Sequence, residues 1–100
     1  MSKWADYCIT AVRYHEPRTA ILEVEIRPDT GTQLGATQRV SRAAVVNAIR
    51  TGTTFVTAYM RNGQWFRGED VRIFQIHGEE YLRTDRDYTR ADNLGSLPQY

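Results

Sequence analysis

The clearest alternation of hydrophobic and polar residues runs through the segment ILEVEIR at 21–27. Leu22, Val24 and Ile26 fall on one side of an extended chain, and charged residues fall on the other. A period of two is that of a strand with one buried face. The segment YCITAVRY at 7–14 is also strand-like, but neither side of it is cleanly polar, which is typical of a central strand covered on both faces. Because the turn-forming segment HEPR lies between them, the two segments predict a hairpin.

The helical period occurs convincingly once, in the segment SRAAVVNAIR at 41–50. Its valine and isoleucine residues form an apolar stripe. Its first serine can cap the first turn by accepting a backbone hydrogen bond, and Gly52 can end the helix in a left-handed conformation. At about three turns the segment is too short to be stable in isolation. It therefore predicts a helix from Ser41 to Arg50 that packs onto a sheet.

Strand-like segments between Thr53 and Thr84 are separated by two tight turns, at Asn62-Gly63 and His77-Gly78. Asn-Gly adopts a positive φ at both positions, which matches the twist of antiparallel strands and closes a two-residue hairpin. Gly68 interrupts the strand pattern and predicts a bulge or a loop. The Asn-Gly register predicts two cross-strand pairs on opposite faces, Met60 with Trp65 and Tyr59 with Phe66.

Together these patterns predict an α+β fold, an antiparallel twisted sheet of about five or six strands with one helix packed on one face. The twist can bend such a sheet toward a partial barrel. The polar segment 33–39 stays ambiguous between a loop and a short extended piece. We expect the buried core to consist of Ile9, Val12, Leu22, Val24, Ile26, Val45, Ile49, Phe55, Val71 and Ile73.

The C-terminal segment 85–100 follows no strand or helix period. It combines turn-forming residues with isolated apolar ones, including Leu94 and Leu97. Disordered segments more often have fewer aromatic residues and a stronger charge imbalance. We therefore expect residues 1–100 to form a single domain in which 85–100 is an ordered, irregular tail packed on the sheet.

Composition narrows the functional classes. The 100 residues are 41% hydrophobic and 25% charged, which is ordinary for a soluble globular protein. The net charge of +1 provides no overall field that would attract nucleic acid or an anionic membrane. The sequence has no apolar run of bilayer length, and the segment MSKWADYCIT at 1–10 has no apolar run long enough for a signal peptide. The single cysteine allows no disulfide within the chain. We expect a cytoplasmic protein without membrane contact, either a monomer or a weak homodimer.

Several segments resemble a family of small, single-domain bacterial proteins of unknown function. The resemblance covers most of the chain and implies one domain. It implies no reaction, cofactor or catalytic residue. The segments that carry it are YCITAVRY at 7–14, SRAAVVNAIRTGTTFVT at 41–57, GQWFRGEDVRI at 63–73, YLRTD at 81–85 and ADNLGSLPQY at 91–100.

Nucleophilic and zinc chemistry find little support in the pattern. Cys8 with His15 or His77 could supply a nucleophile and a base. Reactive cysteines usually lie among positive charges, whereas Cys8 lies within a strand pattern, so a small buried hydrophobe is the favoured interpretation. One cysteine and two separated histidines cannot form a structural zinc site, and a catalytic site would need both histidines and a carboxylate.

Calcium and phosphate motifs are also incomplete. Asp85, Asp87 and Thr89 resemble the start of a calcium loop, but Arg90 stands where the loop needs glycine and Ser96 where it needs glutamate. The seven glycines are scattered and form no phosphate-binding loop. We therefore predict no enzymatic activity, no catalytic residue, no cofactor and no metal site.

Arginine and aromatic residues leave two functional hypotheses. The arginines are interleaved with acidic residues, which is typical of a solvated surface with ion pairs. The favoured hypothesis is a non-catalytic accessory or interaction module that binds a protein or peptide through a sheet edge or an aromatic patch. The alternative is a nucleic-acid-binding accessory protein that uses an arginine-rich, aromatic sheet face.

We expect the binding site where the last strand leaves the sheet and the tail begins. Trp65, Arg83, Asp85, Asp92 and Asn93 could bring directional polar groups near an aromatic ring there. Recognition residues concentrate at loops and strand exits on a rigid scaffold. The alternative is that Arg83 and Asp92 form an ion pair that holds the tail.

Overall fold

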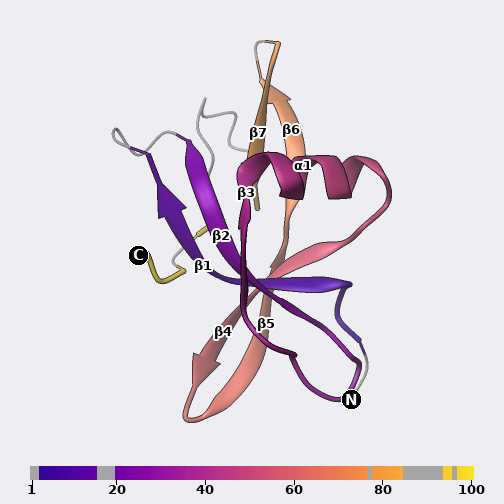
Figure 1. Cartoon of the computed structure of the whole chain (residues 1–100), viewed down its shortest axis with the longest axis vertical. Helices are drawn as coiled ribbons and strands as arrows, with labels where there is room; N and C mark the ends of the chain where they lie inside the picture. The colour runs from indigo at the N-terminus through magenta and orange to yellow at the C-terminus, as the bar shows by residue number, and fades with distance from the viewer. Residues whose placement is uncertain (1–2, 16–19, 77, 85–93, 96) are drawn as a thin grey trace.

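A computed structural model describes residues 3–15, 20–76, 78–84, 94–95 and 97–100. Its longest dimension, 39 Å, runs from the β6–β7 hairpin to the β4–β5 hairpin (Figure 1). The elements within the described residues are β1 Tyr7–Tyr14, β2 Ile21–Pro28, β3 Gln38–Ser41, α1 Arg42–Arg50, β4 Phe55–Arg61, β5 Gln64–Asp70, β6 Arg72–Ile76 and β7 Glu79–Arg83.

The strands form two sheets. Five strands are ordered β3-β2-β1-β4-β5, and β6 pairs with β7 in a separate two-stranded sheet. The predicted α+β class with mostly antiparallel pairing is confirmed, whereas the expectation of one sheet is wrong, and the described strands form no closed barrel. One pair is parallel: residues 7–9 of β1 lie beside residues 55–57 of β4. A local pattern cannot reveal this pairing, because β2, β3 and α1 lie between the two strands in the sequence.

Two bulges determine which side chains of β1 and β2 face the core. Thr10 has no partner in the register between Ile9 and Ala11, and Leu22 has none between Ile21 and Glu23. Each extra residue reverses the alternation that follows it. Ile9 and Val12 therefore lie in one cluster, and Ile21 is buried while Leu22 is 39% exposed. The prediction that Leu22 belongs to the core is wrong, because the alternation in the sequence does not reveal the bulge.

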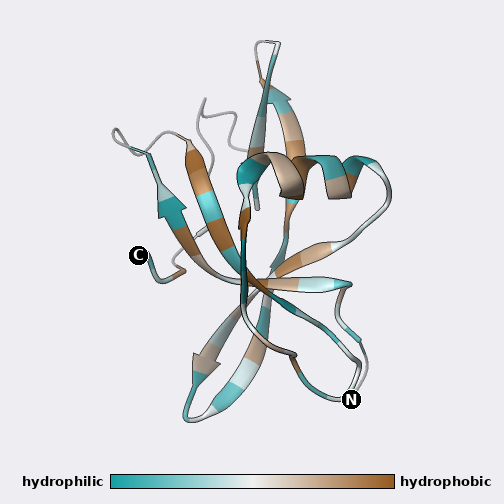
Figure 2. Cartoon of the chain, viewed as in Figure 1, coloured by the Kyte–Doolittle hydropathy of each residue, from teal (hydrophilic) through white to brown (hydrophobic). Residues whose placement is uncertain are grey.

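The main core lies between α1, the inner faces of β1 and β2, and the second sheet. The strand alternation is visible as brown and teal bands along β1 and β2 (Figure 2). Ile49 and Ile73, which were expected in the core, are only partly buried at its margin. The buried cluster consists of Ile9, Val12, Ile21, Val24, Ile26, Val45, Val46, Phe55, Val71, Leu82, Leu94 and Leu97.

The helix forms where the sequence predicts it. Ser41 is the N-cap, and its hydroxyl accepts from the amide of Ala44 at 3.1 Å. Gly52, with φ of 101°, follows the C-terminal end in the left-handed conformation. Contacts of α1 with β2, β3 and β6 join the two sheets. α1 is too short and too polar to cross a bilayer, and the described residues contain no other helix.

The C-terminal end of the described chain is held against β1. The amide of Val12 donates to the carbonyl of Pro98 at 2.9 Å, and the amide of Tyr100 donates to the carbonyl of Val12 at 3.2 Å. β4 pairs with β1 only as far as Thr57, and residues 98–100 lie along the same edge of β1 beyond that point. Leu94 and Leu97 are buried in the main cluster. Residues 85–93 and 96 lie outside the described residues, so the ordered tail over 85–100 stays a prediction.

Candidate functional site

The outer half of the β4–β5 hairpin, residues 58–67, projects from one end of the molecule and is called the hairpin arm (Figure 1). Its turn has φ of 53° at Asn62 and 77° at Gly63, the mirror-image turn that an Asn-Gly pair favours. The predicted register is confirmed in full. The cross-strand pairs are Met60 with Trp65 and Tyr59 with Phe66.

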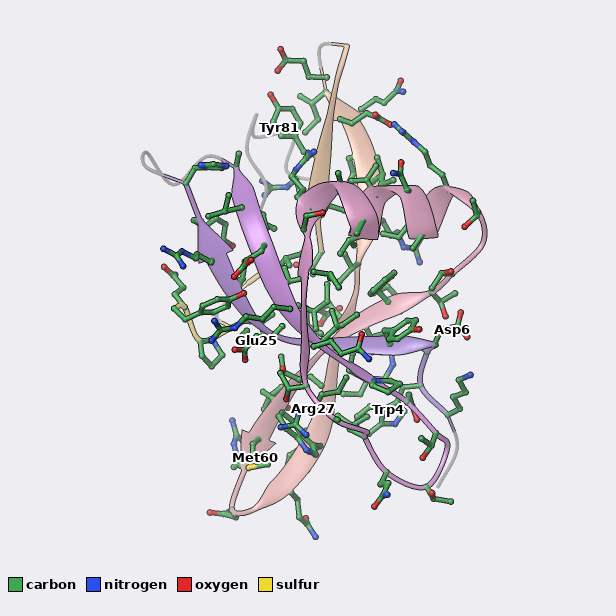
Figure 3. All side chains as sticks on the ribbon, in the orientation of Figure 1. Trp4, Asp6, Glu25, Arg27, Met60 and Tyr81 are labelled. Carbon is green, nitrogen blue, oxygen red and sulfur yellow. The ribbon has the colours of Figure 1, made fainter. Side chains whose placement is uncertain are left out.

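The arm carries hydrophobic side chains that the other described residues leave partly exposed. The described residues expose four large hydrophobic side chains, and three of them, Tyr59, Met60 and Phe66, are on the arm. Tyr59 and Phe66 stack on each other with ring centroids 5.7 Å apart, and the guanidinium of Arg61 lies 5.5 Å from the Tyr59 ring centroid. Met60, on the opposite face, lies at the periphery of the molecule (Figure 3). An exposed apolar patch of this kind is typical of an interaction surface.

A bulge at Gly68 separates the exposed arm from the buried base of the hairpin. Ala58 lies opposite Arg67 while Val56 lies opposite Asp70, so β5 carries one extra residue in this interval, as the sequence predicted. A Cβ atom on Gly68 would lie 2.2 Å from Oγ1 of Thr57 and 3.0 Å from its carbonyl oxygen. The same Oγ1 accepts from the amide of Glu69 at 2.9 Å. The close approach therefore requires glycine and fixes where the regular edge of β5 ends.

The outer edge of β5 is the main backbone feature of the site. β5 ends the five-stranded sheet, and no described strand pairs with its outer edge. In a two-residue hairpin the residue pair next to the turn, here Arg61 and Gln64, is hydrogen-bonded, and non-hydrogen-bonded and hydrogen-bonded pairs then alternate. The backbone of Phe66 is therefore hydrogen-bonded to that of Tyr59. The amide and carbonyl groups of Trp65 and Arg67 therefore point away from β4. Unpaired edge groups are a template for another strand.

The inner face of the arm continues into a hollow beside Trp65. The guanidinium of Arg27 lies 5.3 Å from the Trp65 ring centroid and donates to the carbonyl of Gly35 at 3.1 Å. Trp65 and Leu34 pack against a second buried cluster of Ala5, Cys8, Val56 and Ala58. The hollow has a volume of about 530 Å³, and its lining is uncharged: Thr32, Gln33, Leu34, Gln64 and Trp65.

Of the residues that the sequence analysis grouped into one site, the structure describes Trp65 and Arg83, and these two lie in different sheets. Trp65 is on β5 of the five-stranded sheet, whereas Arg83 is on β7 of the two-stranded sheet, opposite Arg72. Arg83 is 1% exposed, so its guanidinium is not at the surface. Asp85, Asp92 and Asn93 lie outside the described residues. The grouping, and the alternative of an ion pair between Arg83 and Asp92, stay predictions.

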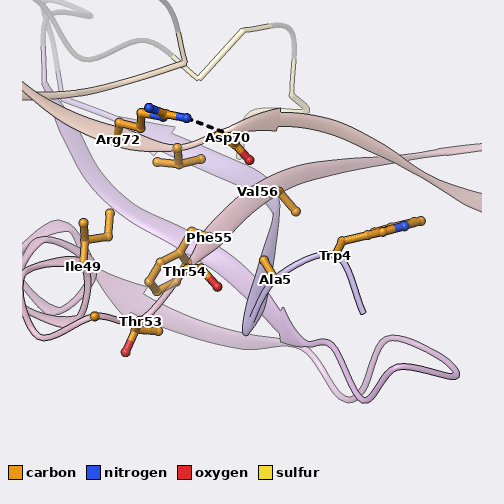
Figure 4. Close-up of a pocket in the computed structure, with 11 residues that line it drawn as sticks. Trp4, Ala5, Ile49, Thr53, Thr54, Phe55, Val56, Asp70 and Arg72 are labelled. Atoms are coloured by element: carbon orange, nitrogen blue, oxygen red, sulfur yellow. Dashed lines mark hydrogen bonds and ion pairs between the residues drawn. The ribbon is translucent and has the colours of Figure 1, made fainter. Parts of the chain in front are cut away.

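A second hollow, of about 410 Å³, lies between the N-terminal segment, the end of α1 and the start of β6 (Figure 4). Trp4, Ala5 and Phe55 of β4 are among its lining residues. The carboxylate at its rim, Asp70, accepts from Arg67 at 2.6 Å and from Arg72 at 3.2 Å. Because these polar groups bind one another, the hollow is a weaker candidate than the arm.

Cys8 is a buried hydrophobe, as the favoured interpretation held. It is 0% exposed, and burial, followed by the charge of Asp29, raises the pKa of its thiol to about 11. A thiol with this pKa contributes little thiolate at neutral pH. Within the described part of the chain no three His, Cys, Asp or Glu residues gather as metal ligands. His77 and the acids of the suggested calcium loop lie outside that part.

Arginines pair with acidic residues over much of the described surface. This agrees with the interpretation of a solvated surface with ion pairs. The pairs are Arg39 with Glu25, Arg50 with Glu80, and both Arg67 and Arg72 with Asp70.

A family model described as "Protein of unknown function (DUF3892)" matches residues 8–98, and the chain therefore belongs to this family. No curated protein and no solved structure matches the chain. The family match confirms the resemblance found in the sequence segments and names no activity.

Proposed function

We propose that this protein is a non-catalytic interaction module whose hairpin arm binds an extended segment of a partner protein. The segment adds as a further strand to the outer edge of β5. In such complexes main-chain hydrogen bonds supply affinity, and pockets for alternate side chains supply specificity. The observation that carries the proposal is the outward direction of the Trp65 and Arg67 backbone groups on an edge flanked by the exposed Tyr59–Phe66 stack.

The two faces of the arm would select different side chains of the partner segment. A residue opposite Phe66 would contact the aromatic stack, which favours an apolar side chain. A residue opposite Trp65 would lie on the face next to the uncharged hollow lined by Gln33 and Gln64, which favours a neutral side chain. Because successive residues of a strand point to opposite faces, the partner segment should show this preference in adjacent positions.

Nucleic-acid binding is the alternative. Arg61 over Tyr59 and Arg27 over Trp65 place cations beside rings that could stack on bases. Peptide binding is favoured because the paired arginines and a net charge of +1 leave little positive field for a phosphate backbone. A reducing compartment suits either function, since Cys8 is the only cysteine.

Selection from a phage-displayed library of random nonapeptides on the immobilised chain tests the proposal. We expect enriched peptides that bind the wild type and lose binding to the double variant Tyr59→Ser/Phe66→Ser. Leu22→Ser is the matched control, because Leu22, Tyr59 and Phe66 are each 39% exposed and Leu22 lies outside the arm. Peptides that bind the double variant as well as the wild type would contradict the proposal.

A labelled single-stranded oligonucleotide separates the two candidate functions. Binding that falls steeply with added salt and disappears in Tyr59→Ser/Phe66→Ser would favour nucleic acid. We expect no such binding under conditions in which the selected peptides bind.

A further inference from the structure

We infer that the outer edge of β5 also pairs with β5 of a second copy of this chain, antiparallel, about a two-fold axis beside Phe66. The inference goes beyond the proposed function, although both use the same edge. It names a specific occupant for that edge and implies that a partner segment competes with self-association.

The hairpin register limits how two copies can pair. Only the backbone groups of Trp65 and Arg67 point outward before the bulge at Gly68. In an antiparallel ladder, a residue whose amide and carbonyl point outward must lie opposite a residue of the other strand whose amide and carbonyl also point outward. A two-fold axis then allows Trp65 opposite Trp65, Arg67 opposite Arg67, or Trp65 opposite Arg67 with Phe66 at the centre.

Charge and geometry favour the third register. Pairing Arg67 with Arg67 opposes like charges and places the bulge next to the centre of the ladder. Pairing Trp65 with Trp65 brings Arg67 opposite Gly63, which belongs to the turn and not to a strand. The register centred on Phe66 uses both outward residues of each copy, and opposite Gln64 it places the uncharged Gly68.

Side chains on both faces are complementary in this register. On one face, Phe66 lies beside Phe66 of the second copy, which extends the Tyr59–Phe66 stack, already 5.7 Å between centroids, into a row of four rings. This row covers two side chains that are 39% exposed in the single chain. On the other face, Arg67 reaches the Trp65 ring of the second copy, and Asp70, 2.6 Å from Arg67, balances its charge.

The bulge at Gly68 keeps this interface small. It ends the regular edge after Arg67, so the ladder cannot extend toward the base of the hairpin. A short ladder gives a reversible dimer that a better-matched segment can displace. This is the weak homodimer that was one of the two states expected from the sequence.

Disulfide trapping with the full-length variant Phe66→Cys tests the register directly. Residues facing each other in a non-hydrogen-bonded antiparallel pair have Cα atoms about 4.5 Å apart, and a disulfide spans roughly 4.4–6.8 Å. Mild oxidation should convert this variant to a covalent dimer. Cys8 does not interfere, because it is fully buried.

Two controls identify random collision. The first is Met60→Cys, because Met60 is 56% exposed but lies on β4. The second is Leu22→Cys, because Leu22 is 39% exposed, like Phe66, but lies outside the arm. Both should stay monomeric under the oxidation that crosslinks Phe66→Cys. Crosslinking of Phe66→Cys no faster than that of the two controls overturns the inference.

Sedimentation of the unmodified wild type gives an independent readout. The apparent mass should rise with concentration, and Phe66→Lys, which opposes two cations at the axis, should remain monomeric with an unchanged circular dichroism spectrum. A wild type that is monomeric at every concentration overturns the inference but leaves peptide selection to decide the proposed function. A concentration-dependent dimer together with a failed peptide selection supports the inference and removes the proposed function.

Discussion

The β1–β2 pair and the hairpin arm are both antiparallel ladders, but their side chains have opposite surroundings. Val12 and Val24 face each other across the first ladder and are 1% and 0% exposed. Tyr59 and Phe66 face each other across the second and are each 39% exposed. The same cross-strand contact is therefore part of a core in one place and of a surface in the other. The difference lies in what covers the sheet, which is α1 and the C-terminal segment in one case and solvent in the other.

This comparison separates residues that maintain the fold from residues available for binding. Hydrophobic stabilisation follows the apolar area removed from water, so fully buried side chains of β1 and β2 contribute far more than the half-exposed rings of the arm. We therefore expect that the arm can be altered at little cost in stability, which is what the proposed interaction surface requires.

The largest expected effect distinguishes two neighbours on β2. Ile21→Ala should lower the free energy of unfolding by about 2–5 kcal/mol, because Ile21 is 2% exposed within the main cluster. Leu22→Ala should cost less than about 1 kcal/mol, as substitutions at exposed positions do. Urea unfolding of both variants measures the difference. Equal losses would show that the bulge at Leu22 is wrong.

Gly68→Ala should destabilise the junction between arm and base by about 1–3 kcal/mol, the usual cost of overpacking. Its Cβ would lie 2.2 Å from Oγ1 of Thr57. Adding Thr57→Ala removes that atom, so the double variant should be more stable than the two separate effects predict. A double-mutant cycle by urea unfolding checks this coupling. Strict additivity would contradict the close approach.

Within the arm, Phe66→Ser should change the free energy of unfolding by only about 0.2–1 kcal/mol, the contribution of one cross-strand pair. Thermal melts of Phe66→Ser and Ile21→Ala in the same buffer compare the arm with the main core directly. A loss from Phe66→Ser as large as that from Ile21→Ala would mean that the arm packs against something in the folded chain.

The smallest expected effect is on the pH dependence of stability and comes from the contact between Asp6 and Thr54. Hydrogen bonds from the Thr54 amide, then from Lys3 and the Thr54 hydroxyl, hold the pKa of the Asp6 carboxyl below its ordinary 3.8. A carboxyl with a lowered folded pKa stabilises the fold at pH values above 3.8, and this contribution disappears as the pH falls through the folded pKa. Asp6→Asn should therefore unfold with a weaker acid dependence than the wild type between about pH 5 and pH 2. Identical acid dependences would show that the Asp6–Thr54 contact is not maintained in solution.

Local chemistry made the hairpin arm and the helix predictable from the sequence. Asn62-Gly63 specifies its turn through backbone conformation alone, so the register of Tyr59 and Phe66 followed from it. Ser41 and Gly52 likewise mark the ends of α1 through local capping. These features depend only on residues within a few positions of one another.

Long-range pairing was not predictable in the same way. The parallel contact of β1 with β4 and the separation of β6 and β7 into a second sheet depend on which distant strands meet. The bulges at Thr10 and Leu22 are invisible because the segments still alternate or remain apolar around them. The outer edge of β5 was missed as a specific site for the same reason: strand order decides which strand is at an edge.

The proposed binding site depends above all on the outer edge of β5. Amide hydrogen exchange of the chain with and without a selected peptide is its most direct test. The chain is held at a concentration where it sediments as a monomer. We expect the amides of Trp65 and Arg67 to exchange quickly in the free chain and slowly in the complex, while the amide of Phe66, bonded to Tyr59, is protected in both. Unchanged exchange at Trp65 and Arg67, with new protection at Gly52 to Thr54 beside the second hollow, would contradict this expectation.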